Sequence, residues 1–84
     1  MLTYLNLGNV YAAVQEFEKA EQAYRRTLEI NPYYAFGSFA LARLYLQTNR
    51  AGRAVTILEQ VGSWLPPDAD AARLLKAARK QMNR

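Results

Sequence analysis

The chain of 84 residues contains no cysteine and no histidine. It therefore cannot form a disulfide, and it lacks the side chains that hold most zinc, haem and iron–sulfur sites. No apolar run approaches the roughly 18 residues that span a bilayer, and no basic-then-apolar leader opens the sequence. These absences predict a soluble chain with no cofactor and no membrane partner. They leave the compartment open, with the cytoplasm as the default.

Proline and glycine are also scarce, at three and four residues. Between these breaks, apolar residues recur with helical spacing, and the prolines at 32, 66 and 67 follow the second and fourth apolar segments. The pattern predicts an all-α fold of five helices. Their expected ranges are about residues 2–14, 17–30, 35–47, 51–64 and 69–82.

The first 34 residues recur, with looser agreement, in the next 34. Small residues fall on small residues, leucine on leucine, tyrosine on tyrosine and proline on proline. Such self-similarity at a fixed period is the mark of a repeat protein. The first set is Tyr4, Leu7, Gly8, Tyr11, Ala20, Tyr24 and Pro32, and the second is Ser38, Leu41, Ala42, Tyr45, Ala54, Leu58 and Pro66.

This spacing resembles the tetratricopeptide repeat, whose pattern is W-x2-L-G-x2-Y, then A-x3-F, then P. Tyr4 replaces the tryptophan, and Gln15 and Asn49 stand at the usual turn glycine. The resemblance implies one domain of antiparallel helix-turn-helix repeats, stacked as a short right-handed solenoid. Residues 1–34 would be the first repeat, 35–68 the second, and 69–84 a C-terminal capping helix. It also implies a non-catalytic scaffold that binds other proteins.

Small residues predict where the first two helices approach most closely, namely at Gly8 and Ala20. The last helix is expected to pack on the fourth through its row of apolar and small residues. It carries Lys76 and Arg79 where the earlier repeats have small and aromatic residues, which suits a solvated cap. The packing row is Ala71, Leu75, Ala78 and Met82.

The first helix presents an apolar row with no preceding helix to cover it. Exposed stripes of this kind mark interfaces or cut edges. Two explanations stay open: the chain is the end of a longer solenoid, or it forms a homo-oligomer through this helix or through its groove. The row, a possible N-terminal stacking interface, is Thr3, Leu7, Val10 and Val14.

In tetratricopeptide repeats, ligands usually lie along the concave surface of the first helix of each repeat. By resemblance, an apolar groove with a few polar groups is expected to bind a peptide or helix of a partner protein. Phe36 and Phe39 are expected to be exposed beside Arg43, as in an interface hot spot, although packing between helices is the alternative for both. The groove residues are Leu2, Leu5, Asn9, Ala12, Phe36, Phe39, Arg43, Leu46 and Arg73.

Other functions are less well supported. Members of the family that grip the C-terminal carboxylate of heat-shock chaperones use five polar positions, of which only Asn9 matches, and Asp70 would repel that carboxylate. The net charge of +4 rests mainly on residues 69–84, so nucleic acid or an acidic partner is an alternative. The basic run lacks interleaved aromatics, which favours a solvated cap over a nucleic-acid site.

The sequence shows no catalytic constellation, because it has neither histidine nor cysteine and its acids gather on one predicted helix. We therefore expect no enzyme and no metal site. Glu18, Glu21 and Glu29 are expected to be solvated charges on the outer face of the second helix.

Overall fold

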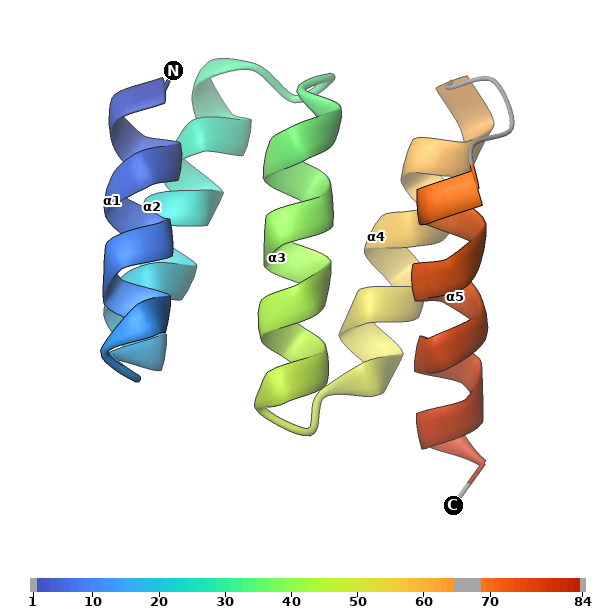
Figure 1. The fold of residues 1–84 in the computed structure, drawn as a ribbon. Helices are drawn as coiled ribbons and strands as arrows, with labels where there is room; N and C mark the ends of the chain where they lie inside the picture. Colours follow the sequence, from blue (N-terminus) through green and yellow to red (C-terminus); the bar gives the residue numbers. More distant parts are fainter. Residues whose placement is uncertain (1, 65–68, 84) are drawn as a thin grey trace.

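The computed structural model describes the backbone of residues 2–64 and 69–83 and the side chains of residues 4–62 and 71–83. It contains five helices (Figure 1): α1 (Leu2–Ala13), α2 (Phe17–Ile30), α3 (Ala35–Gln47), α4 (Ala51–Trp64) and α5 (Ala69–Met82). The predicted all-α fold is confirmed, with α1 ending one residue earlier than expected.

The helices form a repeat stack rather than a closed bundle. Helices α1 and α2 make one antiparallel hairpin, α3 and α4 make the next, and α5 packs on α4. In Figure 1, α1, α3 and α5 lie in the front layer, and α2 and α4 lie behind them. The side of the front layer that faces away from α2 and α4 is called the α1–α3–α5 face below.

Both hairpins turn in the same way, 34 residues apart. After α1, the Glu16 N–H donates to the Tyr11 carbonyl (2.8 Å) and the Gln15 N–H donates to the Ala12 carbonyl (3.1 Å). After α3, the same pair of bonds joins Arg50 to Tyr45 (2.7 Å) and Asn49 to Leu46 (3.3 Å). This is the Schellman arrangement, in which the residue that follows the C-cap of the helix takes a left-handed conformation.

Gln15 and Asn49 hold that conformation, with φ of 64° and 65°. A residue with a β-carbon is strained there, and asparagine tolerates it better than glutamine does. These two residues thus occupy the turn position that the sequence pattern assigns to glycine.

Replacing Gln15 with glycine is expected to raise the free energy of unfolding by about 0.5 to 1 kcal/mol, because the strain at positive φ is removed. Asn49→Gly is the matched comparison. It should gain less or lose stability, since the Asn49 Oδ1 accepts a hydrogen bond from Gln81 Nε2 at 3.0 Å. Urea denaturation of both variants measures the difference, and a destabilised Gln15→Gly chain would contradict the turn geometry.

The core lies between the two layers. Ala20 is fully buried, and a β-carbon built on Gly8 would lie 2.5 Å from Cε1 of Tyr24. The predicted contact of α2 with Gly8 of α1 is therefore confirmed, and the predicted role of Ala20 in it stays a prediction. The buried residues of the central hydrophobic cluster are Ala20, Tyr24, Phe39, Leu41, Ala42, Leu44, Tyr45, Ala54, Leu58, Val61 and Ala78.

A network of charged groups joins α2 to the second hairpin. The Glu21 carboxylate accepts from Arg25 Nη2 (3.0 Å) and Arg50 Nη2 (2.8 Å), and the Tyr45 hydroxyl lies 3.4 Å from it. Burial alone would raise the pKa of Glu21. The hydrogen bond and charge of Arg50, the charge of Arg25 and the hydrogen bond of Tyr45 together outweigh this effect and hold the pKa of Glu21 below its ordinary value. The expectation that Glu21 is solvated is wrong, because its side chain is only 14% exposed.

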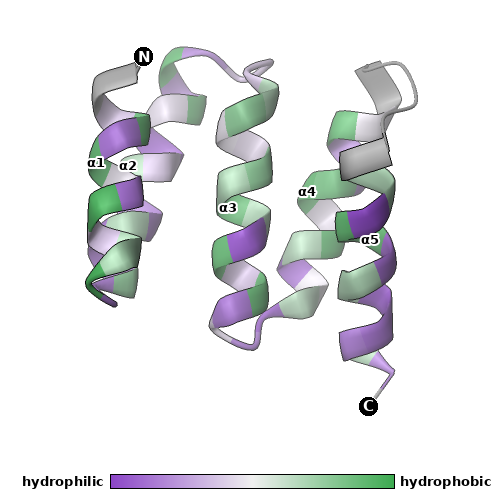
Figure 2. Ribbon diagram, in the orientation of Figure 1, coloured by the Kyte–Doolittle hydropathy of each residue, from purple (hydrophilic) through white to green (hydrophobic). Residues whose placement is uncertain are grey.

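The last helix packs on α4 through most of the predicted row. Ala78 is fully buried, and Ala71 and Leu75 are partly buried against the core. Met82 is 56% exposed and lines a surface hollow with Val55 and Glu59 of α4, so its predicted packing on α4 is at most partial. Lys76 and Arg79 face solvent, and hydrophilic residues dominate the last turns of α5 in Figure 2.

Candidate partner-binding site

Three predicted groove residues meet in one hollow on the α1–α3–α5 face. Asn9 and Ala12 reach it from α1, and Arg43 reaches it from α3, where Ala40 and Gln47 lie one turn away on either side. The hollow has a volume of about 150 Å³, and Tyr24 and Leu44 form the rest of its lining. It is therefore a small, open depression between two helices that the repeat places side by side.

Hydrogen-bond donors are the main polar feature of this hollow. The Tyr24 hydroxyl donates to Asn9 Oδ1 at 2.6 Å, which orients the Asn9 amide and leaves its N–H groups for other acceptors. Burial raises the pKa of Tyr24, while the charge of Arg43 acts in the opposite direction. Arg43 is exposed, and no described carboxylate forms an ion pair with it. The hollow can thus donate to a carbonyl or carboxylate oxygen.

A second hollow of about 270 Å³ lies between α3 and α5. Leu46, another predicted groove residue, lines it with Ala77, Lys80 and Gln81. Gln81 Nε2 donates to the Leu46 carbonyl at 3.3 Å, and so ties α5 to the end of α3. Arg73 is exposed and lies on the same stripe of α5 as Ala77 and Lys80, at spacings of four and seven residues. The face therefore continues from α1 to α5.

The two phenylalanines of the predicted groove differ in exposure. Phe36 is 66% exposed and shares a stripe of α3 with Ala40 and Arg43, and its ring meets Tyr34 edge-on at 5.8 Å. Phe39 is 6% exposed and belongs to the buried core. The expectation that Phe39 is an exposed ligand contact is wrong, because three residues further along the helix the side chain points inward. Phe36 alone remains an exposed aromatic beside Arg43.

The remaining groove predictions fall on α1. Leu5 is partly buried and packs against the core, so only part of its side chain is open to a ligand. The side chain of Leu2 lies outside the described residues.

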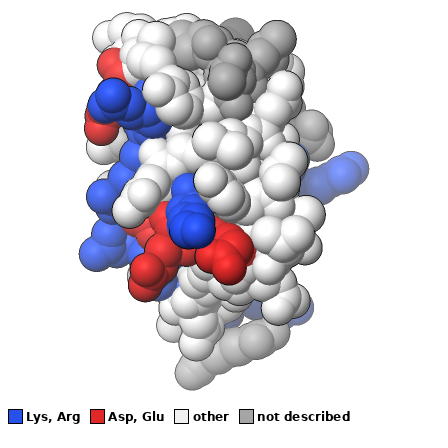
Figure 3. Space-filling view, turned by 90° about the vertical axis from the view of Figure 1, so that its left-hand side faces the viewer, with Lys and Arg blue, Asp and Glu red and all other residues white. Residues whose placement is uncertain are grey.

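The predicted N-terminal row is open to solvent where the structure describes it. Leu7, Val10 and Val14 are 40%, 59% and 63% exposed, and the side chain of Thr3 lies outside the described residues. In Figure 2, hydrophobic residues recur along α1. Figure 3 views this N-terminal face, on which charges gather on one side and a broad uncharged surface occupies the other. Whether the row is an interface stays a prediction.

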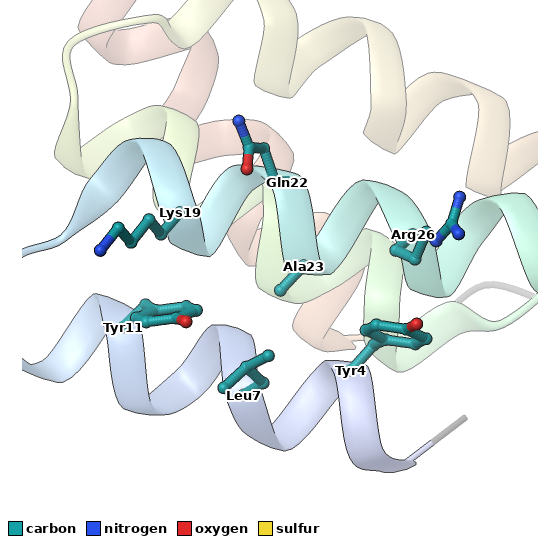
Figure 4. A pocket seen from close by; sticks show the side chains of 7 residues that line it. All are labelled: Tyr4, Leu7, Tyr11, Lys19, Gln22, Ala23 and Arg26. Atoms are coloured by element: carbon teal, nitrogen blue, oxygen red, sulfur yellow. The ribbon is translucent and has the colours of Figure 1, made fainter.

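A hollow of about 400 Å³ lies beside this row, between α1 and α2 (Figure 4). Tyr4, Leu7 and Tyr11 line it from α1. Lys19 extends from α2 toward Tyr11, with its Nζ 5.8 Å from the ring centre, and Arg26 lies near Tyr4 at the other end. Gln22 and Ala23 complete the lining.

Sequence reasoning missed several polar groups of these surfaces. Tyr24 is a core position in the repeat pattern, and nothing in the pattern indicates that its hydroxyl reaches Asn9. Gln81 lies outside the two matched repeats, so no landmark pointed to it. The Glu21–Arg50 pair joins the two hairpins, and neither residue is a landmark of the repeat pattern.

The described residues show neither a metal-binding cluster nor a membrane-spanning helix. No group of three acidic, histidine or cysteine side chains is placed to hold a metal ion within residues 4–62 and 71–83. In the same part of the chain, no helix has the length and apolar character needed to cross a membrane.

Two antiparallel hairpins with matching turns, followed by a fifth helix, define a helical repeat protein. Residues 2–34 match the family model of the tetratricopeptide repeat, and this match supports the resemblance found in the sequence. Such a repeat is a non-catalytic element that supports protein–protein interaction.

One relative is itself an enzyme. The UDP-N-acetylglucosamine–peptide N-acetylglucosaminyltransferase of Giardia intestinalis (strain ATCC 50803 / WB clone C6) is 40% identical over 47 residues. The match covers 56% of this chain but only 3% of that protein. The transferase activity in the name is therefore a property of that protein.

Proposed function

We propose that the chain is a non-catalytic interaction module that binds a segment of a partner protein along the α1–α3–α5 face. In this proposal, residues 1–34 and 35–68 are the two repeats, and residues 69–84 are the cap. The spacing of the two turns supports the division, since both hydrogen bonds that close the first turn recur 34 residues later in the second.

One observation carries the proposal: an exposed aromatic side chain and an exposed arginine lie on the same stripe of α3, beside a hollow. Phe36 offers apolar area, and Arg43 offers directed donors at the hollow that Asn9 also lines. Aromatic and arginine side chains dominate the binding energy of many interfaces. Such an arrangement suits a short extended or helical segment with apolar side chains.

The basic residues of the α1–α3–α5 face indicate which partner segment would bind there. Within the described residues, Arg43 and Lys80 line the two hollows described above and no acidic residue does, and Arg73 lies on the same stripe as Lys80. A segment with one or more carboxylates among its apolar residues would therefore bind best. The expected partner is therefore an acidic peptide that binds the α1–α3–α5 face, and not only the basic residues near the C-terminus.

Selection of binders from a displayed library of random peptides tests the proposal. We expect the selected peptides to combine apolar and acidic residues. Phe36→Ala and Arg43→Gln should each weaken them by about five- to thirtyfold, which corresponds to roughly 1 to 2 kcal/mol per contact. Lys76→Gln, which removes an exposed lysine elsewhere on α5, is the matched control and should change nothing. Binders that ignore both Phe36 and Arg43 would refute the site.

A further inference from the structure

The two hairpins present equivalent surfaces, but only one of them is covered. On α3, Leu41 and Leu44 are 3% and 1% exposed, and they continue the stripe of Gly37, which faces Thr27 and Leu28 of α2. On α1, the residues 34 positions earlier are Leu7 and Val10, and they are 40% and 59% exposed. The covered surface therefore shows what kind of element fits the open one: an amphipathic α-helix.

Helix α2 is held on the second hairpin at two points. At one end, the Glu21 carboxylate accepts hydrogen bonds from Arg50 Nη2 at 2.8 Å and from the Tyr45 hydroxyl at 3.4 Å. The Arg50 guanidinium lies 4.9 Å from the centre of the Tyr45 ring. At the other end, Gly37 lets Thr27 and Leu28 come close to α3. The receptor for the α2 carboxylate on the second hairpin is thus a tyrosine hydroxyl beside a cation.

The first hairpin carries the same receptor without a carboxylate from another helix. Tyr11 stands where Tyr45 stands one period later, and the Lys19 ammonium lies 5.8 Å from its ring centre (Figure 4). Glu16 occupies the position of Arg50, so the cation comes from Lys19 one turn later. The Tyr11 hydroxyl has no hydrogen bond to any described residue. The contact of Lys19 with Glu16 is long, at 4.0 Å, and solvent-exposed, so it is weak.

We propose that the surface formed by Tyr4, Leu7, Val10, Tyr11 and Lys19 is a second binding site, and that its ligand is an amphipathic α-helix of a partner protein. This helix places a carboxylate against the Tyr11 hydroxyl and Lys19, and lays small and apolar side chains on Leu7 and Val10. The proposal does not depend on the α1–α3–α5 face.

Two features narrow the choice of ligand. Thr3 stands where α3 has Gly37, so the helix needs small residues at the positions of Thr27 and Leu28. A second copy of this chain does not meet the requirement through α2, since Glu21 is already held by Arg50 and the helix is covered by α3. At the other end of the hollow, Arg26 is paired with Glu29 at 3.1 Å. Lys19 is the cation that lies over the Tyr11 ring, where the carboxylate of the ligand is placed.

The probe is a peptide with the sequence of residues 16–31, because α2 is the helix that covers the equivalent surface. Thr27→Ala and Leu28→Ala adapt it to Thr3, and a lactam between Glu18 and Gln22→Lys holds it helical at two positions away from the contact with α3. A second probe differs only by Glu21→Gln. Both are titrated into the isotope-labelled full chain, and backbone amide shifts report where and how tightly they bind.

We expect shifts centred on residues 7–14, and about three- to tenfold weaker binding of the Glu21→Gln probe, the size typical of a partly exposed charged hydrogen bond. In a Tyr11→Phe/Lys19→Gln chain, the two probes should bind equally and weakly. Lys76→Gln, a lysine exchange at an exposed position of α5, should preserve the difference. Equal affinities for the original chain, or shifts away from α1, would overturn the proposal. So would a dimer through α1 in light scattering, since the occupant would then be a second copy.

Discussion

Replacing Phe39 with alanine is expected to lower the free energy of unfolding by about 3 to 5 kcal/mol, as is typical when a buried phenylalanine is truncated. The side chain is 6% exposed and belongs to the central cluster of the core. A chain of this size has a total stability of only about 4 to 13 kcal/mol, so the variant should melt far below the original chain or be unfolded at room temperature. Thermal and urea denaturation followed by circular dichroism measure the loss.

Phe36→Ala is the matched control, because it removes the same ring from the same helix at a position that is 66% exposed. Its stability should stay within about 0.5 kcal/mol of the original chain. The two variants together separate folding from binding: Phe36 is the aromatic to change in a binding assay, and Phe39 is not. Similar losses from both replacements would show that the assignment of inward and outward faces on α3 is wrong.

The pair also shows how far the sequence predicts this molecule. The helices, the turns and the contact at Gly8 follow from spacing and from residue size, which are local properties of a repeat. The orientation of α3 is set by what packs on each of its sides. Helix α3 contacts α1, α2, α4 and α5, so most of its positions are buried. An aromatic residue at a predicted groove position of α3 can therefore be buried, as Phe39 is.

Glu21 and Met82 also show what the sequence does not predict. Glu21 is more buried than expected, and Met82 is more exposed. A glutamate on a charged helix face is usually solvated, but the partner that buries Glu21 is Arg50, in the next hairpin and far along the sequence. Met82 continues the apolar row of α5, yet it lies at the last residue of the helix, where it stays exposed. The repeat can therefore be predicted from the sequence, whereas contacts between repeats and the packing of helix ends are seen only in the three-dimensional structure.

The second large effect is expected at Gly8. A β-carbon there would lie 2.5 and 2.6 Å from two ring carbons of Tyr24, and that ring is buried and held by the bond from its hydroxyl to Asn9. Gly8→Ala is therefore expected to destabilise the chain by about 1 to 3 kcal/mol, even though alanine has the higher helix propensity. Equilibrium unfolding in urea measures this loss.

Gly52→Ala reverses the sign and serves as the control. Nothing lies within 4 Å of a β-carbon at Gly52, so the variant should gain up to about 1 kcal/mol from helix propensity alone. Combining Gly8→Ala with Tyr24→Leu tests the cause. The second replacement removes the ring that Gly8 faces, so the cost of Gly8→Ala should shrink in its presence. An unchanged cost would mean that the glycine is required for a reason other than the close approach of α1 and α2.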